Sequence, residues 1–200
     1  ALDAANRELK EEVGMGASFG NAGHIATEQL FPLASPEVIR NSWRYLQGAD
    51  GPLRLRLGYL LPILPWLARF VWAARPRSFA RGVAALLALQ ESARDDLAQL
   101  LKDAGAAHLL HLDGHLEVWE SMAGRSAALT LARRLRPYGI ESVPVSASAL
   151  HEDTSALSAS VQGGVHYFDS GHVDDPHAVC TTLARGLLQR GGRILEGRVE

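Results

Sequence analysis

Length, composition and charge set the first limits on what this chain is. It has 200 residues, 47% of them hydrophobic, which is enough for a sizeable core in one domain or a small pair of domains. Its 20 Lys and Arg residues against 22 Asp and Glu residues leave a net charge of -2, which argues against a nucleic-acid binder with a basic face. The single cysteine, Cys180, excludes an internal disulfide and fits a reducing compartment such as the cytoplasm.

The first residues predict a helix followed by a loop. Ala1 to Lys10 has the spacing of an amphipathic helix, with Leu2, Ala5 and Leu9 on one face. Glu11 to Gly23 contains four glycines and few large apolar residues, so it should be a loop.

A long helical stretch is predicted from Ser35 to Ala104. Its apolar residues recur at helical spacing, most clearly from Ser78 to Asp103. Prolines break or kink helices, and they should do so here at Pro52, Pro62, Pro65 and Pro76.

The second half alternates strands and helices. His108 to Trp119 predicts two short strands paired around the turn Asp113-Gly114, a strong hairpin signal. A helix should run from about Met122 to Arg136 and stop before Pro137.

The last third predicts two more strands and a capped helix. Val161 to Tyr167 is a strand candidate. Asp175 is a good N-cap and Pro176 a good first helical residue, so a helix should follow to about Arg190. Gly191-Gly192 should end this helix, and Arg193 to Val199 reads as a closing strand.

One loop carries a functional signal. Gly14 to Ile25 (GMGASFGNAGHI) consists mostly of small residues, which let the backbone approach a ligand closely and turn N–H groups toward phosphate. Ser18 and Asn21 add hydrogen-bonding groups without bulk. An ordinary tight loop is the alternative interpretation.

Three segments resemble one enzyme family in their order and spacing. Ala17 to Ile25 (ASFGNAGHI) resembles the loop after the second strand in FAD-dependent D-amino acid dehydrogenases, glycine oxidases and D-amino acid oxidases. Gly163 to Pro176 (GGVHYFDSGHVDDP) is similar to the family's strand and turn before a helix. Gly191 to Val199 (GGRILEGRV) is similar to its returning strand.

The resemblance implies an α/β fold. The family has a three-layer, Rossmann-like FAD-binding domain with an inserted mixed-sheet substrate domain, of which this chain would hold only the middle. On this basis we expect four segments: 1–27 as a remnant of the FAD-binding domain, 28–105 as a helical excursion, 106–174 as substrate-domain strands and helix, and 175–200 as the return to the FAD-binding domain.

The resemblance also implies site residues. The loop would lie along the pyrophosphate, ribityl chain and flavin edge of FAD, with contacts from Ser18, Asn21, Ala22, Gly23, His24, Ile25 and Val199. His24 and Tyr167 are candidates for the substrate side, and no catalytic residue is assigned. The plainer alternatives are a loop histidine bonded to backbone at position 24 and an ordinary strand residue at Val199.

The implied reaction is the oxidative deamination of a D-amino acid or a cyclic imino acid, by hydride transfer to FAD. A quinone or oxygen would accept the electrons. The alternative is a non-catalytic fragment or subunit that binds a protein partner or a membrane through its apolar helical region.

Two features of the family are missing from the sequence. It has no G-x-G-x-x-G turn, and Lys10 runs into Glu11 without the expected buried strand between them. We therefore expect a break or deletion at this point, and weak FAD binding by the chain as it stands.

Histidines and an apolar stretch complete the candidates. His108, His111 and His115 lie close in sequence, as do His166, His172 and His177, but their spacing does not match a zinc site, so we expect no metal. Leu57 to Ala74 is strongly apolar. We favour a buried helical cover there; the alternative is contact with the inner face of the cytoplasmic membrane through Trp66 and Trp72.

Overall fold

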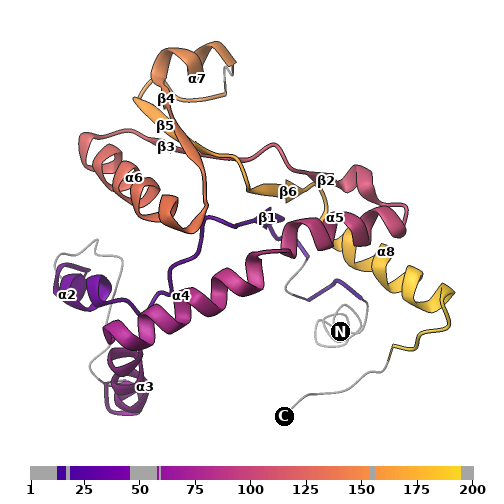
Figure 1. The fold of residues 1–200 in the computed structure, drawn as a ribbon, viewed down its shortest axis with the longest axis horizontal. Helices are drawn as coiled ribbons and strands as arrows, with labels where there is room; N and C mark the ends of the chain where they lie inside the picture. Colours follow the sequence, from indigo (N-terminus) through magenta and orange to yellow (C-terminus); the bar gives the residue numbers. More distant parts are fainter. Residues whose placement is uncertain (1–12, 17–18, 46–57, 59, 154–155, 195–200) are drawn as a thin grey trace. The chain divides into compact units, whose positions relative to one another are not determined.

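The structure is a computed structural model that describes residues 13–16, 19–45, 58, 60–153 and 156–194. Its contacts divide the chain into two compact units, one formed by Ala1–Glu28 with Ser92–Glu200 and the other by Gln29–Glu91. Figure 1 shows the helices and strands of both units. The predicted helix from Ala1 to Lys10 and the expected break before Glu11 lie outside the described residues.

The unit Gln29–Glu91 is helical, as its sequence predicts. It contains α2 (Pro36–Tyr45), α3 (Leu60–Ala73) and α4 (Pro76–Gln90). Pro76 occupies the first position of α4, where no backbone N–H is needed, so it starts a helix. Pro65 lies inside α3 and does not end it. The carbonyl that loses its partner there belongs to Leu61, whose side chain is exposed, so water can replace the missing N–H.

Residues before α2 pack against α4. Leu30 is fully buried, and the Phe31 ring stacks on Phe79 with ring centroids 6.1 Å apart. A Cβ atom added to Gly82 would lie 3.0 Å from the Pro32 ring, so glycine permits a close approach there. The core of this unit therefore forms between the entry segment and α4.

The apolar side chains of α3 are exposed. At least half of the surface is accessible in each of five residues: Leu61, Leu64, Trp66, Val71 and Trp72. The prediction that this stretch forms a buried helical cover is wrong for these five residues. Within the described part of the chain, no helix combines the length and the apolar character that crossing a membrane requires.

The other unit contains two small antiparallel sheets. In one, β6 (Gly171–Val173) lies between β1 (His24–Ile25) and β2 (Leu110–His111). In the other, β5 (Gly163–Tyr167) lies between β3 (His115–Trp119) and β4 (Ser142–Ser146). The sequence did not predict β4, and it predicted β6 only as a turn.

The predicted hairpin is wrong. β2 and β3 do not pair with each other. β2 pairs with β6 and β3 pairs with β5, so the segment β2–β3 runs antiparallel to the segment β5–β6. The register passes from His111↔His172 to His115↔Tyr167 across an interruption. Gly114, with φ +94°, carries the chain through it, and its N–H donates to the Ser170 carbonyl at 3.1 Å. The Asp113-Gly114 turn therefore joins two sheets instead of closing a hairpin.

The described part of this unit also contains the helices α5 (Ala93–Asp103), α6 (Met122–Leu135), α7 (Ala147–Asp153) and α8 (Pro176–Gln189). Single 3-10 turns lie at Ala107–Leu109 and Arg136–Tyr138. The predicted cap of α8 is confirmed, because the Asp175 carboxylate accepts from the N–H groups of His177 and Ala178. Gly191, with φ +80°, ends the helix as expected.

Two buried groups hold the sheets in place. Leu101 of α5, Ala106 and Val173 of β6 form one cluster, against which Ile25 and Leu109 pack. The central strand β5 is buried over most of its length, and α6 and α7 both contact it. The expected α/β class is confirmed, and all strand pairs among the described residues are antiparallel.

Candidate functional site

The predicted cofactor loop is fixed to the sheet by its own backbone. Asn21 Oδ1 accepts from the Gly23 N–H at 2.8 Å, and the Gly23 carbonyl accepts from the Val173 N–H at 2.9 Å. Gly23 has φ +67°, a left-handed conformation that favours glycine. The loop therefore ends in a defined turn that leads into β1.

The tip of the loop offers free backbone donors. Gly20, Asn21 and Ala22 are exposed, and their N–H groups have no acceptor among the described residues. Successive N–H groups without an acceptor, next to a left-handed residue such as Gly20 with φ +70°, can bind an anion such as a pyrophosphate. The loop thus fits the cofactor group that the sequence implies. Ser18 and Val199 lie outside the described residues.

His24 leaves the loop on β1 and enters a polar cluster. Its ring stacks on that of His115 from β3, with centroids 4.4 Å apart and planes at 29°. His24 Nε2 lies 3.4 Å from Glu28 Oε1, but the two are not aligned as a hydrogen bond, and this buried nitrogen has no hydrogen-bond partner among the described residues. Ile25, the next residue, packs on the apolar cluster of β6 and α5, so its side chain belongs to the core.

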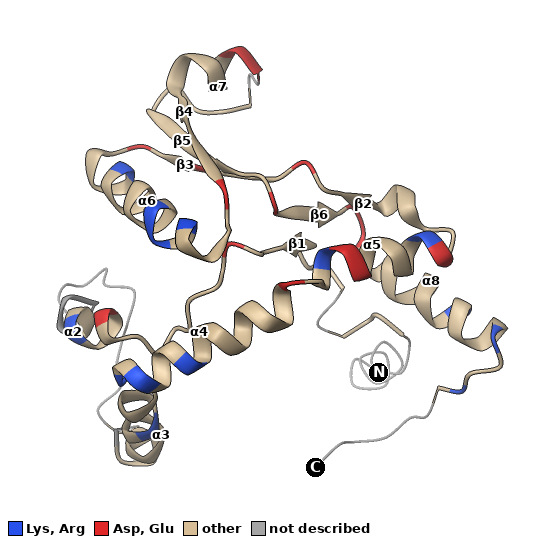
Figure 2. Cartoon of the chain, in the orientation of Figure 1, with Lys and Arg blue, Asp and Glu red and all other residues tan. Residues whose placement is uncertain are grey.

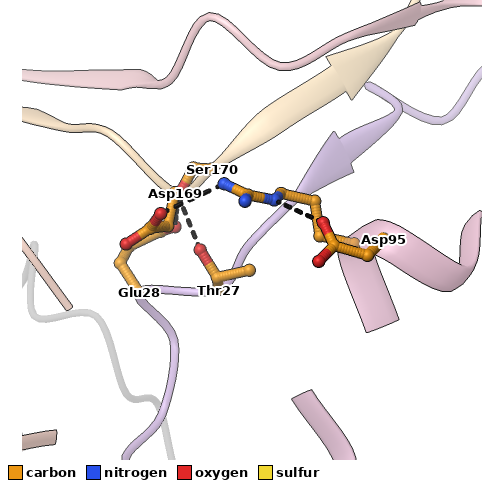
Figure 3. A network of polar contacts seen from close by, with 6 residues as sticks. Thr27, Glu28, Asp95, Asp169 and Ser170 are labelled. Atoms are coloured by element: carbon orange, nitrogen blue, oxygen red, sulfur yellow. Dashed lines mark hydrogen bonds and ion pairs between the residues drawn. The ribbon is translucent and has the colours of Figure 1, made fainter. Parts of the chain in front are cut away.

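Glu28 also belongs to a network of polar contacts with Thr27, Asp169 and Ser170, which Figure 3 shows. Glu28 is only 7% exposed, and its Oε2 accepts a hydrogen bond from the Ser170 hydroxyl. Since the Ser170 hydrogen is used there, the Thr27 hydroxyl donates to Ser170 Oγ across 3.2 Å. Next to Ser170, Asp169 forms an ion pair with Arg94 at 3.0 Å.

Tyr167 also stacks on His115. Its ring is 1% exposed and its centroid is 6.5 Å from that of His115. The phenol hydroxyl faces Glu117 Oε2 at 3.5 Å. Burial, followed by the negative charges of Glu117 and Glu28, raises the pKa of Tyr167 from 10.0 to about 12. The phenol is therefore a protonated donor at neutral pH.

The structure brings both substrate-side candidates into one group. His24 and Tyr167 meet through His115, which sequence reasoning named only as one of a histidine run. It also missed Glu28 and Glu117. The spacing of four residues between His24 and Glu28 could have indicated that they interact. The pairing of β3 with β5 could not be predicted, because those strands are far apart in sequence.

Two groups among the described residues could hold a metal ion. One is His24, Glu28 and His115; the other is His111, His172 and Asp174. Each draws its members from distant segments, so neither corresponds to a histidine run named from the sequence. The fold thus creates two candidate ligand sets that the spacing of the histidines does not indicate.

A separate groove of about 560 Å³ lies between α6 and the β4–β5 edge. Arg133, Arg136 and Phe168 are among the residues that line it. None of the candidate cofactor or substrate residues that the structure describes is among those lining this groove.

Comparison with known proteins gives consistent matches. The chain is 25% identical over 185 residues to a D-amino-acid oxidase of Bradyrhizobium diazoefficiens, covering 91% of this chain and 43% of that protein. It is 30% identical over 148 residues to a D-amino acid dehydrogenase of Dechloromonas aromatica, covering 74% and 35%. The chain spans less than half the length of either relative.

A solved structure and a family profile complete the comparison. A glycine oxidase from Geobacillus kaustophilus has a similar fold, with a TM-score of 0.51 and 15% identity, over 92% of this chain and 37% of that one. The profile of the family described as FAD dependent oxidoreductase matches residues 8–200. Since this match covers nearly the whole chain, the chain belongs to the FAD-dependent oxidoreductase family.

Proposed function

We propose that this protein oxidises a D-amino acid or a cyclic imino acid by hydride transfer from the substrate to FAD. One observation carries the proposal: the N–H groups of Gly20 to Ala22, which have no acceptor in the described part of the chain, lie within a few residues of the His24 cluster. The loop that we propose binds FAD is therefore next in sequence to the residues that we propose contact the substrate. Family membership supports FAD, and the names of the two relatives support the substrate class.

The residues of this chain would bind and orient. The backbone of Gly20 to Ala22 would hold the cofactor. On the substrate side, His24 would face the substrate, and the buried Tyr167 would support His115, on which its ring stacks. FAD, when bound, supplies the acceptor for two electrons. The electrons would then pass to a quinone or to oxygen.

Charge around the cluster suits an amine. Glu28 lies beside His24, and Glu117 faces the hydroxyl of Tyr167, so both carboxylates adjoin the group of His24, His115 and Tyr167. Tyr167 adds no negative charge at neutral pH, because its pKa is raised to about 12. Two carboxylates favour the approach of a substrate ammonium group.

FAD titration of the purified protein, followed through the flavin spectrum, tests cofactor binding by the loop. Ala22→Glu puts a negative charge beside the free N–H groups at an exposed position, so it should weaken FAD binding by at least about tenfold without disturbing packing. Ala127→Glu, at an exposed position of α6, is the matched control and should bind FAD like the parent. Equal affinity of all three proteins would exclude the loop from the site, and failure of the parent to bind would favour a non-catalytic subunit or fragment.

We also propose that the protein is cytoplasmic and contacts the inner face of the membrane through α3 and α4. The exposed apolar side chains of α3 favour this contact. From Leu60 to Gln90 there is no Asp or Glu, whereas four arginines occur: Arg69, Arg75, Arg77 and Arg81. Figure 2 shows these two helices with basic and without acidic residues. Apolar surface with arginines nearby is typical of binding to anionic lipids.

A further inference from the structure

Strands β2 and β6 bring three metal-binding side chains together on one side of their sheet. Their ligand atoms all lie within 4.8 Å of one another; they belong to His111, His172 and Asp174. His111 and His172 are direct partners in the register, so both project from the same face. Their rings stack with centroids 4.9 Å apart and planes at 17°.

The two nitrogens of His172 face two different carboxylates. Its Nε2 lies 3.8 Å from Asp174 Oδ1, and its Nδ1 lies 3.7 Å from Asp113 Oδ1. The other oxygen of Asp174 lies 2.9 Å from His111 Nε2. A metal-binding histidine has this arrangement, in which one nitrogen binds the ion and the opposite N–H points to a carboxylate that fixes the ring. This second carboxylate is an observation independent of the three ligand atoms.

We propose that His111, His172 and Asp174 bind a divalent transition-metal ion of the Zn²⁺ type, with Asp113 as a positioning residue for His172. Two imidazoles and one carboxylate are a ligand set that zinc takes, whereas Mg²⁺ and Ca²⁺ prefer oxygen ligands alone. The side chains are each about half exposed, which leaves a further coordination position open to water.

The geometry needs only a small adjustment. Two ligand atoms at bonding distance from a tetrahedral zinc ion lie about 3.4 Å apart. His111 Nε2 and Asp174 Oδ2, now 2.9 Å apart, would open by about 0.5 Å, and atoms up to 4.8 Å apart would close by about 1.4 Å at most. Half-exposed side chains can make both movements by rotation. The other candidate group, His24, Glu28 and His115, is less available for a metal ion. Glu28 already accepts a hydrogen bond from Ser170, and the two histidines belong to the proposed substrate site.

The ion would tie β2 to β6. β2 has only two residues, and Asp174 directly follows β6, where its N–H donates to the Leu109 carbonyl at 3.0 Å. Bound metal would clamp this short strand to the strand that also holds the cofactor loop, so it should raise the Tm of the protein.

Isothermal titration of Zn²⁺ into the EDTA-treated protein, prepared without a polyhistidine tag, tests the site. We expect one ion per chain and a Tm that rises with Zn²⁺. His172→Ala and Asp174→Asn should each weaken binding more than about tenfold and remove the rise in Tm, and Asp113→Asn should weaken it about tenfold. His108→Ala, in the exposed turn before β2, is the control and should bind like the parent.

Three results would overturn the proposal. The first is no Zn²⁺ binding by the parent. The second is unchanged affinity in both Asp174→Asn and His172→Ala. The third is loss of binding in His115→Ala with retention in Asp174→Asn, which would place the ion in the other group. Asp174→Asn keeps the size of the side chain, so the site can be judged even if His172→Ala does not fold. None of these measurements requires FAD, so they are independent of the proposed reaction.

Discussion

Gly23 and Val173 are in contact so close that a Cβ atom on Gly23 would lie 2.3 Å from the Val173 carbonyl oxygen. From the sequence alone, the glycine is attributed to the nearby cofactor. The structure gives a reason within the chain itself, because the side chain would meet backbone and Gly23 also has φ +67°. Gly23 is thus required by the fold before any cofactor binds.

Gly23→Ala should therefore destabilise the protein by about 3 kcal/mol or more, from left-handed strain and the clash combined. Gly20→Ala is the matched control: φ is +70°, but a Cβ there meets nothing within 4 Å, so strain alone of about 1 kcal/mol should remain. Urea unfolding of both variants gives the comparison. Equal stability losses would mean that the Val173 contact is not as close as described.

Ser170 should matter more than its size indicates. It donates to the buried Glu28 carboxylate and accepts from Thr27. Ser170→Ala removes this donor from a buried charge and should cost about 1–3 kcal/mol in the free energy of unfolding. Ser158→Ala, which removes a hydroxyl from an exposed turn, should change it by less than about 0.5 kcal/mol. Similar losses in the two variants would show that Glu28 does not depend on Ser170.

The phenol of Tyr167 should lose its proton only at a pH well above that of an ordinary tyrosine. Burial and the charges of Glu117 and Glu28 raise its pKa from 10.0 to about 12. Because the folded state holds this proton more tightly than the unfolded state, the stabilisation is complete below pH 10 and is lost as the pH rises from 10 to about 12. The difference in tyrosinate absorbance between the parent and Tyr167→Phe isolates this residue from the other tyrosines. Glu117→Gln should lower the midpoint; a midpoint near 10 in the parent would contradict the burial.

Binding to anionic vesicles tests the exposed face of α3. Leu61→Ser with Leu64→Ser removes two exposed apolar side chains, so it should weaken binding to phosphatidylglycerol vesicles more than about tenfold and leave the protein folded. The matched control is Leu187→Ser with Leu188→Ser on α8, also exposed, which should bind like the parent. If the α3 variant unfolds instead, the helix is a buried cover in the working protein; unchanged binding would rule out the membrane contact.

Local signals could be predicted from the sequence, and long-range pairing could not. The Asp175 cap and Pro176 determine the start of α8 through contacts within a few residues. The turn at Asp113-Gly114 was equally local, but strand partners far along the chain decide what it joins. A Gly-containing turn is compatible with both outcomes.

The candidate site shows the same division. A short string of small residues suggests a ligand-binding loop, because a loop near a ligand needs small residues in a row, and the resemblance to the family implies FAD as that ligand; the contact itself stays a prediction. The cluster around His24 depends on β3 and β5 meeting near β1. In the sequence, Glu28 is marked only by its spacing of four residues from His24; its burial and its bond to the Ser170 hydroxyl depend on the fold.

Anaerobic reduction of the flavin tests the central claim most directly. The protein is loaded with FAD, mixed without oxygen with D-alanine or D-proline, and compared with the same protein mixed with the L-enantiomers. We predict loss of the oxidised flavin absorbance with a D-substrate only, and slower reduction in His24→Ala than in the control His108→Ala while both still hold FAD. An FAD-loaded protein whose flavin stays oxidised with every D-amino acid and imino acid, or one reduced equally by both enantiomers, would contradict the proposed function.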